Sequence, residues 1–248
     1  MISNRNWLVL FALSLLCSSI LLFILHFEIF HDFHHILIYT IHDLAFLPVE
    51  VLLVTVILHQ MLERQAMKNK LNKLNMVIGV FFSEIGVPLM RVFASYDLEL
   101  KMKTDFFSSL STWDHVTFLR KKKEAMKFHF YSPLSCENLV SLREMLLQKE
   151  DLMIRMLENP MLLEHESFTD LLQAIFHLTD ELRYRGDCMN LPDSDIHHLS
   201  GDITRGYSLM IPTWLTYLEY LKTNYPYLYS LAVRTNPFSE NVDVIIRE

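Results

Sequence analysis

Glycine is scarce in this sequence. Only five glycines occur in 248 residues, whereas the tight turns of sheet-rich folds draw heavily on this residue. The chain has thirteen methionines and a high count of leucines, and both residue types have high helix propensity. This composition predicts an all-α protein.

Cysteine is also scarce. Cys17, Cys136 and Cys188 are widely spaced, and they fit neither a disulfide framework nor a cysteine-based metal motif. We therefore expect the soluble part of the chain to lie in a reducing compartment.

Long basic runs are missing, and the formal net charge is −7. Nucleic-acid binding requires a clustered basic surface, so we expect no nucleic-acid partner. The one basic cluster is Arg120-Lys121-Lys122-Lys123. A solvated loop or helix start explains it better than contact with anionic lipid headgroups.

Several catalytic motifs are absent. The sequence has no glycine-rich phosphate loop, no G-x-S-x-G elbow and no H-E-x-x-H helix. We assign no catalytic residue and expect no enzymatic activity.

Two apolar runs stand near the N-terminus. The first covers residues 7–25, within a stretch that has no charged side chain between Arg5 and Glu28; the second covers residues 36–58. Each is about as long as a helix that crosses a lipid bilayer. The sequence predicts two transmembrane helices joined as a hairpin, with residues 36–58 continuing as one long helix at least to Pro88.

The charges around these runs predict their orientation. The connector FEIFHDFHH contains no lysine or arginine, whereas basic residues flank the outer end of each run. By the positive-inside rule, both termini then face the cytoplasm and the chain resides in the inner (plasma) membrane. The basic residues at the membrane surface are Arg5 before the first run, and Arg64, Lys68, Lys70 and Lys73 after the second.

We expect a membrane hairpin at residues 1–62, a cytoplasmic helical bundle at 63–238 and a C-terminal tail at 239–248. Apolar residues three and four apart form a heptad-like seam after the second run. This seam needs a partner, which is either a second copy of the chain or the rest of the bundle. Its members are Leu71, Leu74, Ile78, Phe81 and Ile85.

Capping residues and breakers delimit further helices. Ser135 precedes a helix that ends at Asn159-Pro160, and Ser167 precedes one that ends before Gly186. A third runs from about Asp193 to Tyr225, with a kink expected at Pro212, and a fourth covers 225–235. The segment NVDVIIRE at 241–248 is a short strand or a tail.

Four unusual residues lie in the second apolar run. Asp43 and Glu50 are seven apart, which places both carboxylates on one helix face, and Pro48 frees a backbone carbonyl beside them. If the helix enters the hydrocarbon at Ile36, Asp43 and His42 are intramembrane; if it enters at Leu44, both lie among the headgroups. Glu50 and Pro48 are intramembrane in either case. Charged residues inside a bilayer are costly and face a partner, a cavity or water, so the carboxylates either support helix assembly or line an ion or proton path.

The soluble part offers candidate metal ligands. Three pairs at i, i+4 place two ligand side chains on one helix face, and helical bundles build metal sites from such facing pairs. The alternative is a solvated helix surface. No cofactor is predicted apart from this metal. The pairs are His177 with Glu181, His198 with Asp202, and Glu166 with Asp170.

Other charged residues allow two expectations. Glu84 and Arg91, seven apart, are expected to form a structural ion pair. Arg183, Arg185 and Arg205 bracket polar loops, where they either bind an anion or serve as ordinary surface arginines.

Two segments, HDLAFLPVEVLLVTVILH at 42–59 and YPYLYSLAVRTNPF at 225–238, resemble a family of uncharacterised prokaryotic membrane proteins with two transmembrane helices and a cytoplasmic helical domain. The resemblance covers most of the chain and implies that layout. It implies no activity.

The sequence thus predicts a membrane-anchored helical interaction or regulatory module without enzymatic activity. We expect a homo-oligomer, with a cytoplasmic protein as a further partner. The first alternative is a small oligomeric ion or proton channel that uses Asp43 and Glu50. The second is a membrane-tethered metalloenzyme in the helical bundle.

Overall fold

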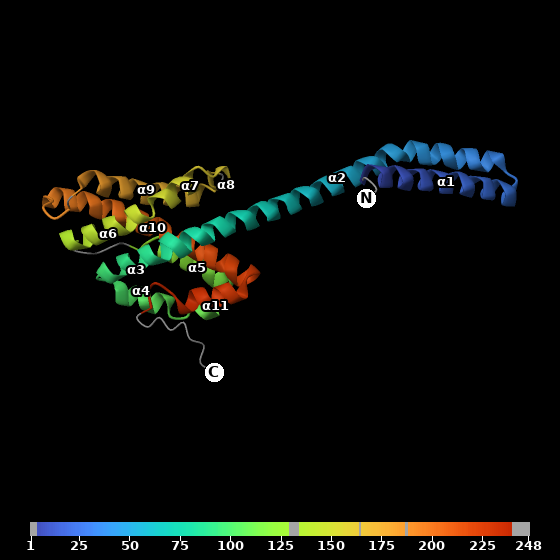
Figure 1. Ribbon diagram of the computed structural model, residues 1–248. Helices are drawn as coiled ribbons and strands as arrows, with labels where there is room; N and C mark the ends of the chain where they lie inside the picture. Colours follow the sequence, from blue (N-terminus) through green and yellow to red (C-terminus); the bar gives the residue numbers. More distant parts are fainter. Residues whose placement is uncertain (1–3, 129–133, 164, 187, 240–248) are drawn as a thin grey trace. The chain divides into compact units, whose positions relative to one another are not determined.

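The computed structural model describes residues 4–128, 134–163, 165–186 and 188–239. Regular structure in these ranges is entirely helical, which confirms the all-α prediction (Figure 1). The helices are α1 (Asn4–Phe30), α2 (Phe33–Phe81), α3 (Val87–Tyr96), α4 (Leu100–Phe107), α5 (His115–Ala125), α6 (Cys136–Gln148), α7 (Glu150–Leu157), α8 (Pro160–Leu163), α9 (Glu166–Arg185), α10 (Asp193–Asn224) and α11 (Pro226–Arg234). A π-helical turn covers Phe82–Gly86, and a 3-10 turn covers Leu110–Thr112. The segment NVDVIIRE lies outside the described residues.

The chain divides into two compact units, Met1–Lys68 and Asn69–Glu248. The first unit contains α1 and the first part of α2, which fold back on each other as a helical hairpin (Figure 1). The connection passes through His31, whose φ is 51°. The domain boundaries expected from the sequence stay a prediction.

The surface of the first unit is strongly apolar. Side chains such as Leu21 and Leu52 are more than 60 % exposed, and burial of such groups is the main driving force of folding. By length and composition, Val9–Phe30 and the helix that begins at Phe33 are apolar enough to cross a membrane. The predicted spans therefore lie on two exposed apolar helices.

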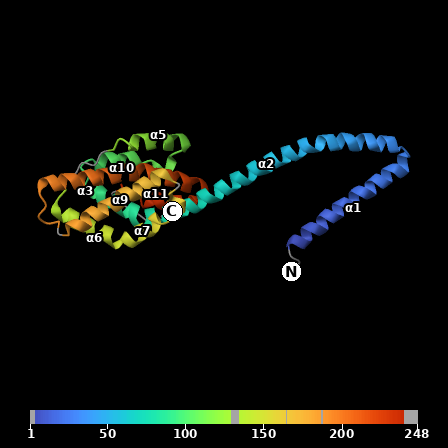
Figure 2. The same cartoon turned by 90° about the horizontal axis from the view of Figure 1, so that it is seen from above.

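The second unit is built around α10. One face of this helix is fully buried, with Ile203, Tyr207, Met210 and Trp214 in the core. Helices α5, α9 and α11 pack against it, and α9 lies along α10 in both views (Figures 1 and 2). Pro212 lies inside α10 without ending it. This helix is the framework that positions the candidate site.

The apolar seam at the end of α2 packs inside the second unit. Leu74, Ile78, Phe81 and Ile85 are at most 5 % exposed, and they join the same core as α10. Leu71 is the exception, with 46 % of its surface exposed. The partner of the seam is therefore the rest of the bundle, which is one of the two alternatives left open by the sequence.

The predicted continuation of the second run to Pro88 is confirmed, with one irregularity. The chain passes from α2 through the π-helical turn into α3 without leaving the helical conformation. Pro88 lies in the first turn of α3, directly after the π-helical turn, so it removes one backbone donor where the helical hydrogen-bond pattern is already irregular.

Three local predictions are wrong. The single helix expected up to Asn159 is broken at Lys149 into α6 and α7. Helix α9 begins before Ser167, because the His165 side chain accepts a hydrogen bond from the Phe168 N–H and caps the helix. Glu84 pairs with Lys149 at 2.8 Å instead of with Arg91.

Arg91 instead donates a hydrogen bond to the backbone carbonyl of Thr235 at 3.2 Å. Both changes in pairing have the same physical basis. The fold brings Lys149, at the break between α6 and α7, and Thr235, which caps the end of α11, next to residues far away in the sequence.

Two glycines allow α9 and α10 to lie together. Gly186 ends α9 with φ +65°, in the left-handed region that L residues avoid. A Cβ at Gly206 would lie 2.8 Å from Cδ1 of Ile175, so the absence of a side chain there permits the close approach of the two helices.

Candidate functional site

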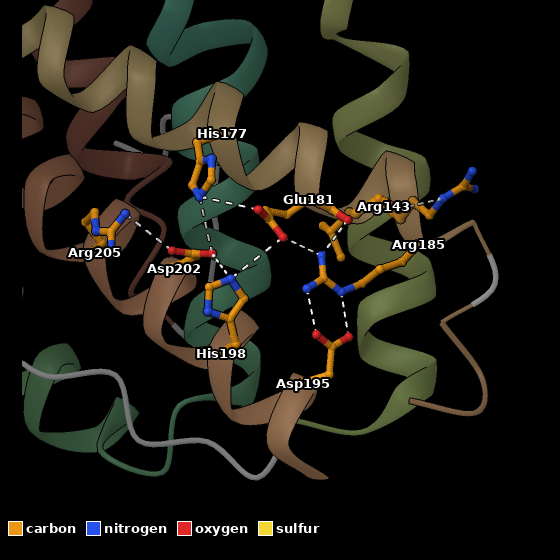
Figure 3. Close-up of polar contacts among 9 residues, drawn as sticks. Arg143, His177, Glu181, Arg185, Asp195, His198, Asp202 and Arg205 are labelled. Carbon is orange, nitrogen blue, oxygen red and sulfur yellow. Dashed lines mark hydrogen bonds and ion pairs between the residues drawn. The ribbon is translucent and has the colours of Figure 1, made fainter. Parts of the chain in front are cut away.

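Two of the three predicted ligand pairs meet between α9 and α10 (Figure 3). His177 and Glu181 come from α9, whereas His198 and Asp202 come from α10. Nε2 of His177 lies 3.7 Å from Oε1 of Glu181 and 3.7 Å from Oδ2 of Asp202. Nε2 of His198 lies 3.4 Å from Oδ2 of Asp202 and 3.7 Å from Oε2 of Glu181. We refer to these four residues as the histidine–carboxylate cluster.

Helix geometry explains why the cluster forms. Residues four apart share one helix face, so each helix presents one imidazole and one carboxylate. The helices run in opposite directions, because His177 contacts Asp202 while Glu181 contacts His198. Each histidine therefore faces carboxylates from both helices.

Asp202 is the buried member of the cluster. Its side chain is 3 % exposed, whereas those of His177 and His198 are 47 % and 54 % exposed. Oδ1 lies 3.4 Å from Nη1 of Arg205. Oδ2 has no hydrogen-bond partner, which is unusual for a buried carboxylate oxygen.

Arg185 holds the other carboxylate of the cluster, that of Glu181, in place. Its Nη1 donates to Oε2 of Glu181 at 2.5 Å, and its Nε and Nη2 donate to the two oxygens of Asp195 at 2.6 and 2.7 Å. The hydrogen bond from Arg185 lowers the pKa of Glu181, and the same guanidinium lowers the pKa of Asp195. Both carboxylates are thus ionised at neutral pH.

The three arginines that bracket polar loops all pair with carboxylates of the chain. Arg183 forms ion pairs with Glu150 and Asp180, Arg185 binds Glu181 and Asp195, and Arg205 contacts Asp202. The structure therefore supports intramolecular pairing of these arginines over a free anion site.

The third predicted pair does not join the cluster. Glu166 lies eleven residues before His177 on α9, about 16 Å along the helix axis at about 1.5 Å per residue, and Asp170 lies one turn closer. As the side chains stand, no group of three or more His, Cys, Asp and Glu residues in the described ranges is arranged as a metal centre.

The candidate intramembrane residues lie on α2. His42, Asp43 and Glu50 are exposed, and Pro48 lies inside the helix without ending it. Close to the hairpin connection, Ser18 and Ser19 of α1 line a cavity of about 600 Å³ together with Leu22, Phe23, His26, His35 and Tyr39.

The predicted membrane-surface cations follow on α2, where the side chains of Arg64, Lys68 and Lys73 are exposed and that of Lys70 is half-buried.

Sequence reasoning missed a buried ion pair in the second unit. The Lys103 ammonium contacts Oδ2 of Asp97, and both side chains are fully buried. Burial and the negative charge of Asp97 raise the pKa of the neighbouring Tyr207. The sequence carries no clear signal of this pair, because a lysine on a short helix normally indicates a solvated face.

Comparison with known proteins gives a consistent result across the chain. Residues 3–62 match the family model "MJ1433, N-terminal helical domain", and residues 70–234 match "Uncharacterized protein MJ1433, C-terminal helical domain". No solved structure matches the chain.

A relative from Methanocaldococcus jannaschii, "Uncharacterized protein MJ1433", is 42 % identical over 246 residues. The match covers 99 % of this chain and 98 % of the relative. The similarity therefore extends through both units, and the chain belongs to the MJ1433 family, with an N-terminal and a C-terminal helical domain.

Proposed function

We propose that this protein is a membrane-anchored helical module without enzymatic activity, whose second unit acts as a cytoplasmic interaction or regulatory domain. The observation that carries this proposal is the exposed apolar surface of α1 and the first part of α2. Two adjacent helices of this kind need an apolar environment, and a lipid bilayer supplies one.

The second unit supports the role of a separate domain. Its helices enclose a continuous core that includes Phe93, Phe168, Tyr207 and Trp214, and the apolar seam of α2 is satisfied inside that core. Such a unit has the internal packing that a domain needs to bind a partner or to respond to one.

The distribution of lysine and arginine supports the proposed orientation in the membrane. Arg64, Lys68, Lys70 and Lys73 follow the second apolar run, and the connector at 27–35 has no lysine or arginine. Basic residues are retained on the cytoplasmic side, so this distribution favours cytoplasmic termini in the inner (plasma) membrane.

Fractionation and reporter fusions test the anchor and its orientation. The full chain should sediment with membranes, resist extraction at alkaline pH and dissolve only in detergent. A fluorescent protein at the C-terminus should fold in the cytoplasm, whereas a periplasmic enzyme reporter inserted in the 27–35 connector should be active. A chain found in the soluble fraction, or a C-terminal reporter active outside the cell, contradicts the proposal.

Self-association is part of the proposal. The carboxylates of Asp43 and Glu50 are exposed on an apolar helix, and in lipid such groups face a partner, a cavity or water. Light scattering in detergent should give the mass of several chains, and Glu50→Gln should weaken this association. A single-chain mass at every concentration contradicts self-association but leaves the anchor intact.

The same carboxylates favour one second candidate, a small ion or proton channel. If the protein is a channel, the wild type in liposomes should conduct ions or protons. Asp43→Asn and Glu50→Gln should then reduce this flux while the oligomer stays assembled. Absence of flux from wild-type liposomes eliminates the channel.

A further inference from the structure

We propose that one divalent transition-metal ion binds at the histidine–carboxylate cluster, held by His177, Glu181, His198 and Asp202. This inference concerns the second unit and does not rest on the membrane anchor. It depends on an unsatisfied carboxylate oxygen, on the spacing of the donor atoms and on the arginines that surround them.

The unsatisfied atom is Oδ2 of Asp202. It is buried, lacks a hydrogen-bond partner and faces both imidazole Nε2 atoms at 3.4 and 3.7 Å. These separations exceed the usual 2.7–3.2 Å of a hydrogen bond. A buried carboxylate oxygen that accepts no hydrogen bond is costly, and a cation at this point would satisfy it.

The spacing of the donor atoms fits a metal better than a water molecule. Ligands about 2.1 Å from a tetrahedral Zn²⁺ lie about 3.4 Å from one another. Four groups hydrogen-bonded to one water at about 2.8 Å would lie about 4.6 Å apart. Three separations between the proposed ligand atoms are close to the first geometry. Nε2 of His177 lies 3.7 Å from Oε1 of Glu181 and 3.7 Å from Oδ2 of Asp202, and Nε2 of His198 lies 3.4 Å from the same Oδ2.

The side chains must still adjust to close on an ion, since they are not arranged as a metal centre as they stand. His177 and His198 are about half exposed, so their imidazole rings have room to rotate. Asp202 is held inside the helix pair and supplies the fixed ligand.

The ligand types indicate the class of ion. Imidazole nitrogen together with carboxylate oxygen suits Zn²⁺, Fe²⁺, Ni²⁺ or Cu²⁺, whereas Mg²⁺ and Ca²⁺ prefer oxygen alone.

An arginine lies on the outer side of each carboxylate. Arg185 holds Oε2 of Glu181 and leaves Oε1 directed at His177, and Arg205 lies beside Oδ1 of Asp202, so that Oδ2 faces the histidines. Hydrogen bonds that fix ligand orientation in this way accompany metal sites generally. Arg185 is therefore a positioning residue for the ion.

Metal titration of the full chain in detergent tests the proposal. Protein treated with EDTA and then desalted is titrated with Zn²⁺ against a chromophoric chelator, and with Co²⁺ by visible absorption. We expect one ion per chain, an absorption band of tetrahedral Co²⁺ and a higher melting temperature with Zn²⁺.

Variants then locate the site. His177→Ala and His198→Ala should each weaken Zn²⁺ binding at least about tenfold, and Arg185→Gln about tenfold. His197→Ala is the matched control, since His197 is the exposed neighbour of His198, and Glu166→Gln removes a carboxylate of α9 outside the cluster. Both controls should bind like wild type.

Because His177 and His198 are exposed, their alanine variants should fold like wild type, and far-UV circular dichroism checks this. For Asp202→Asn, which alters a buried group, the melting temperature without metal separates loss of folding from loss of binding. The proposal is overturned if wild type binds neither Zn²⁺ nor Co²⁺ at 1:1, or if His198→Ala and His197→Ala bind equally well.

Discussion

Arg185 forms two parallel hydrogen bonds with Asp195, from Nε to Oδ2 at 2.6 Å and from Nη2 to Oδ1 at 2.7 Å, and so fastens the end of α9 to the start of α10. Its Nη1 also binds Glu181. One side chain thus links the helix connection to the histidine–carboxylate cluster.

Arg185→Ala should lower the free energy of unfolding by roughly 1.5–3 kcal/mol at neutral pH, the range for hydrogen bonds to charged groups. The matched control is Arg205→Ala, because Arg205 is 61 % exposed and contacts Asp202 only at 3.4 Å. Urea unfolding measures both, and an equal effect of the two substitutions contradicts the anchoring role of Arg185.

The hydrogen bonds of Arg185 to Asp195 and Glu181 predict that the free energy of unfolding depends on pH. Arg185 lowers the pKa of Asp195 and of Glu181, so their contribution to stability is present above the pKa values of the unfolded chain, about 4, and is lost as the pH falls through the folded values. The difference between wild type and Arg185→Ala should therefore shrink below about pH 4. A difference that stays constant down to about pH 2 would show that these carboxylates are not involved.

The buried pair of Lys103 and Asp97 predicts strong non-additivity. Lys103→Met leaves a fully buried carboxylate without its counter-ion and should cost about 3–5 kcal/mol. Combining it with Asp97→Asn should cost less than the sum of the single substitutions. Denaturant unfolding of all four proteins gives the coupling free energy, and a value near zero contradicts the pairing.

Gly186 and Gly201 make a matched pair of glycines. Gly186 has a φ of +65°, whereas Gly201 lies inside α10 with open space where a Cβ would lie. Gly186→Ala should destabilise by roughly 1–3 kcal/mol because of backbone strain, and Gly201→Ala should stabilise by about 1 kcal/mol through helix propensity. Thermal unfolding measures the change in stability for each substitution. If both substitutions destabilise the protein, the difference in backbone conformation between Gly186 and Gly201 does not explain their effects.

Tyr229 predicts a change at alkaline pH. Its hydroxyl donates to the Leu110 carbonyl at 2.6 Å, and burial raises the pKa of Tyr229 to about 12. Its contribution is complete below the unfolded pKa of about 10 and is lost as the pH rises through the folded value.

Tyr229→Phe should cost about 1 kcal/mol at neutral pH, and Tyr227→Phe should cost almost nothing, because Tyr227 is 70 % exposed. Unfolding at neutral pH and at about pH 11 should show that the cost of Tyr229→Phe decreases. An equal cost at both pH values would contradict a pKa of Tyr229 that is higher in the folded than in the unfolded chain.

Several elements were predictable from local sequence. The bounds of α10, the capping role of Ser135 and the end of α9 before Gly186 follow from propensity, caps and breakers. The break at Lys149 was not predictable, because neither proline nor glycine marks it. There, Glu150 at the start of α7 pairs with Arg183 of α9, a contact between residues far apart in the sequence.

The candidate site was likewise predictable only in part. Spacing at i, i+4 places His177 with Glu181 and His198 with Asp202, but the identical spacing of Glu166 and Asp170 leads to no cluster. Only the packing of α9 against α10 selects two pairs of the three. The burial of Lys103 likewise depends on surrounding helices, and no periodicity of its own segment reveals it.

By itself, the sequence determined the helical class, the positions of most helices, the two long apolar helices and the pairing of ligands on single helix faces, because these depend on interactions within a few residues. Only the tertiary structure decided which faces meet, where Asp202 loses access to water and why Arg185 binds two carboxylates. Those outcomes depend on contacts between distant residues, which the close approach of α9 and α10 at Gly206 allows.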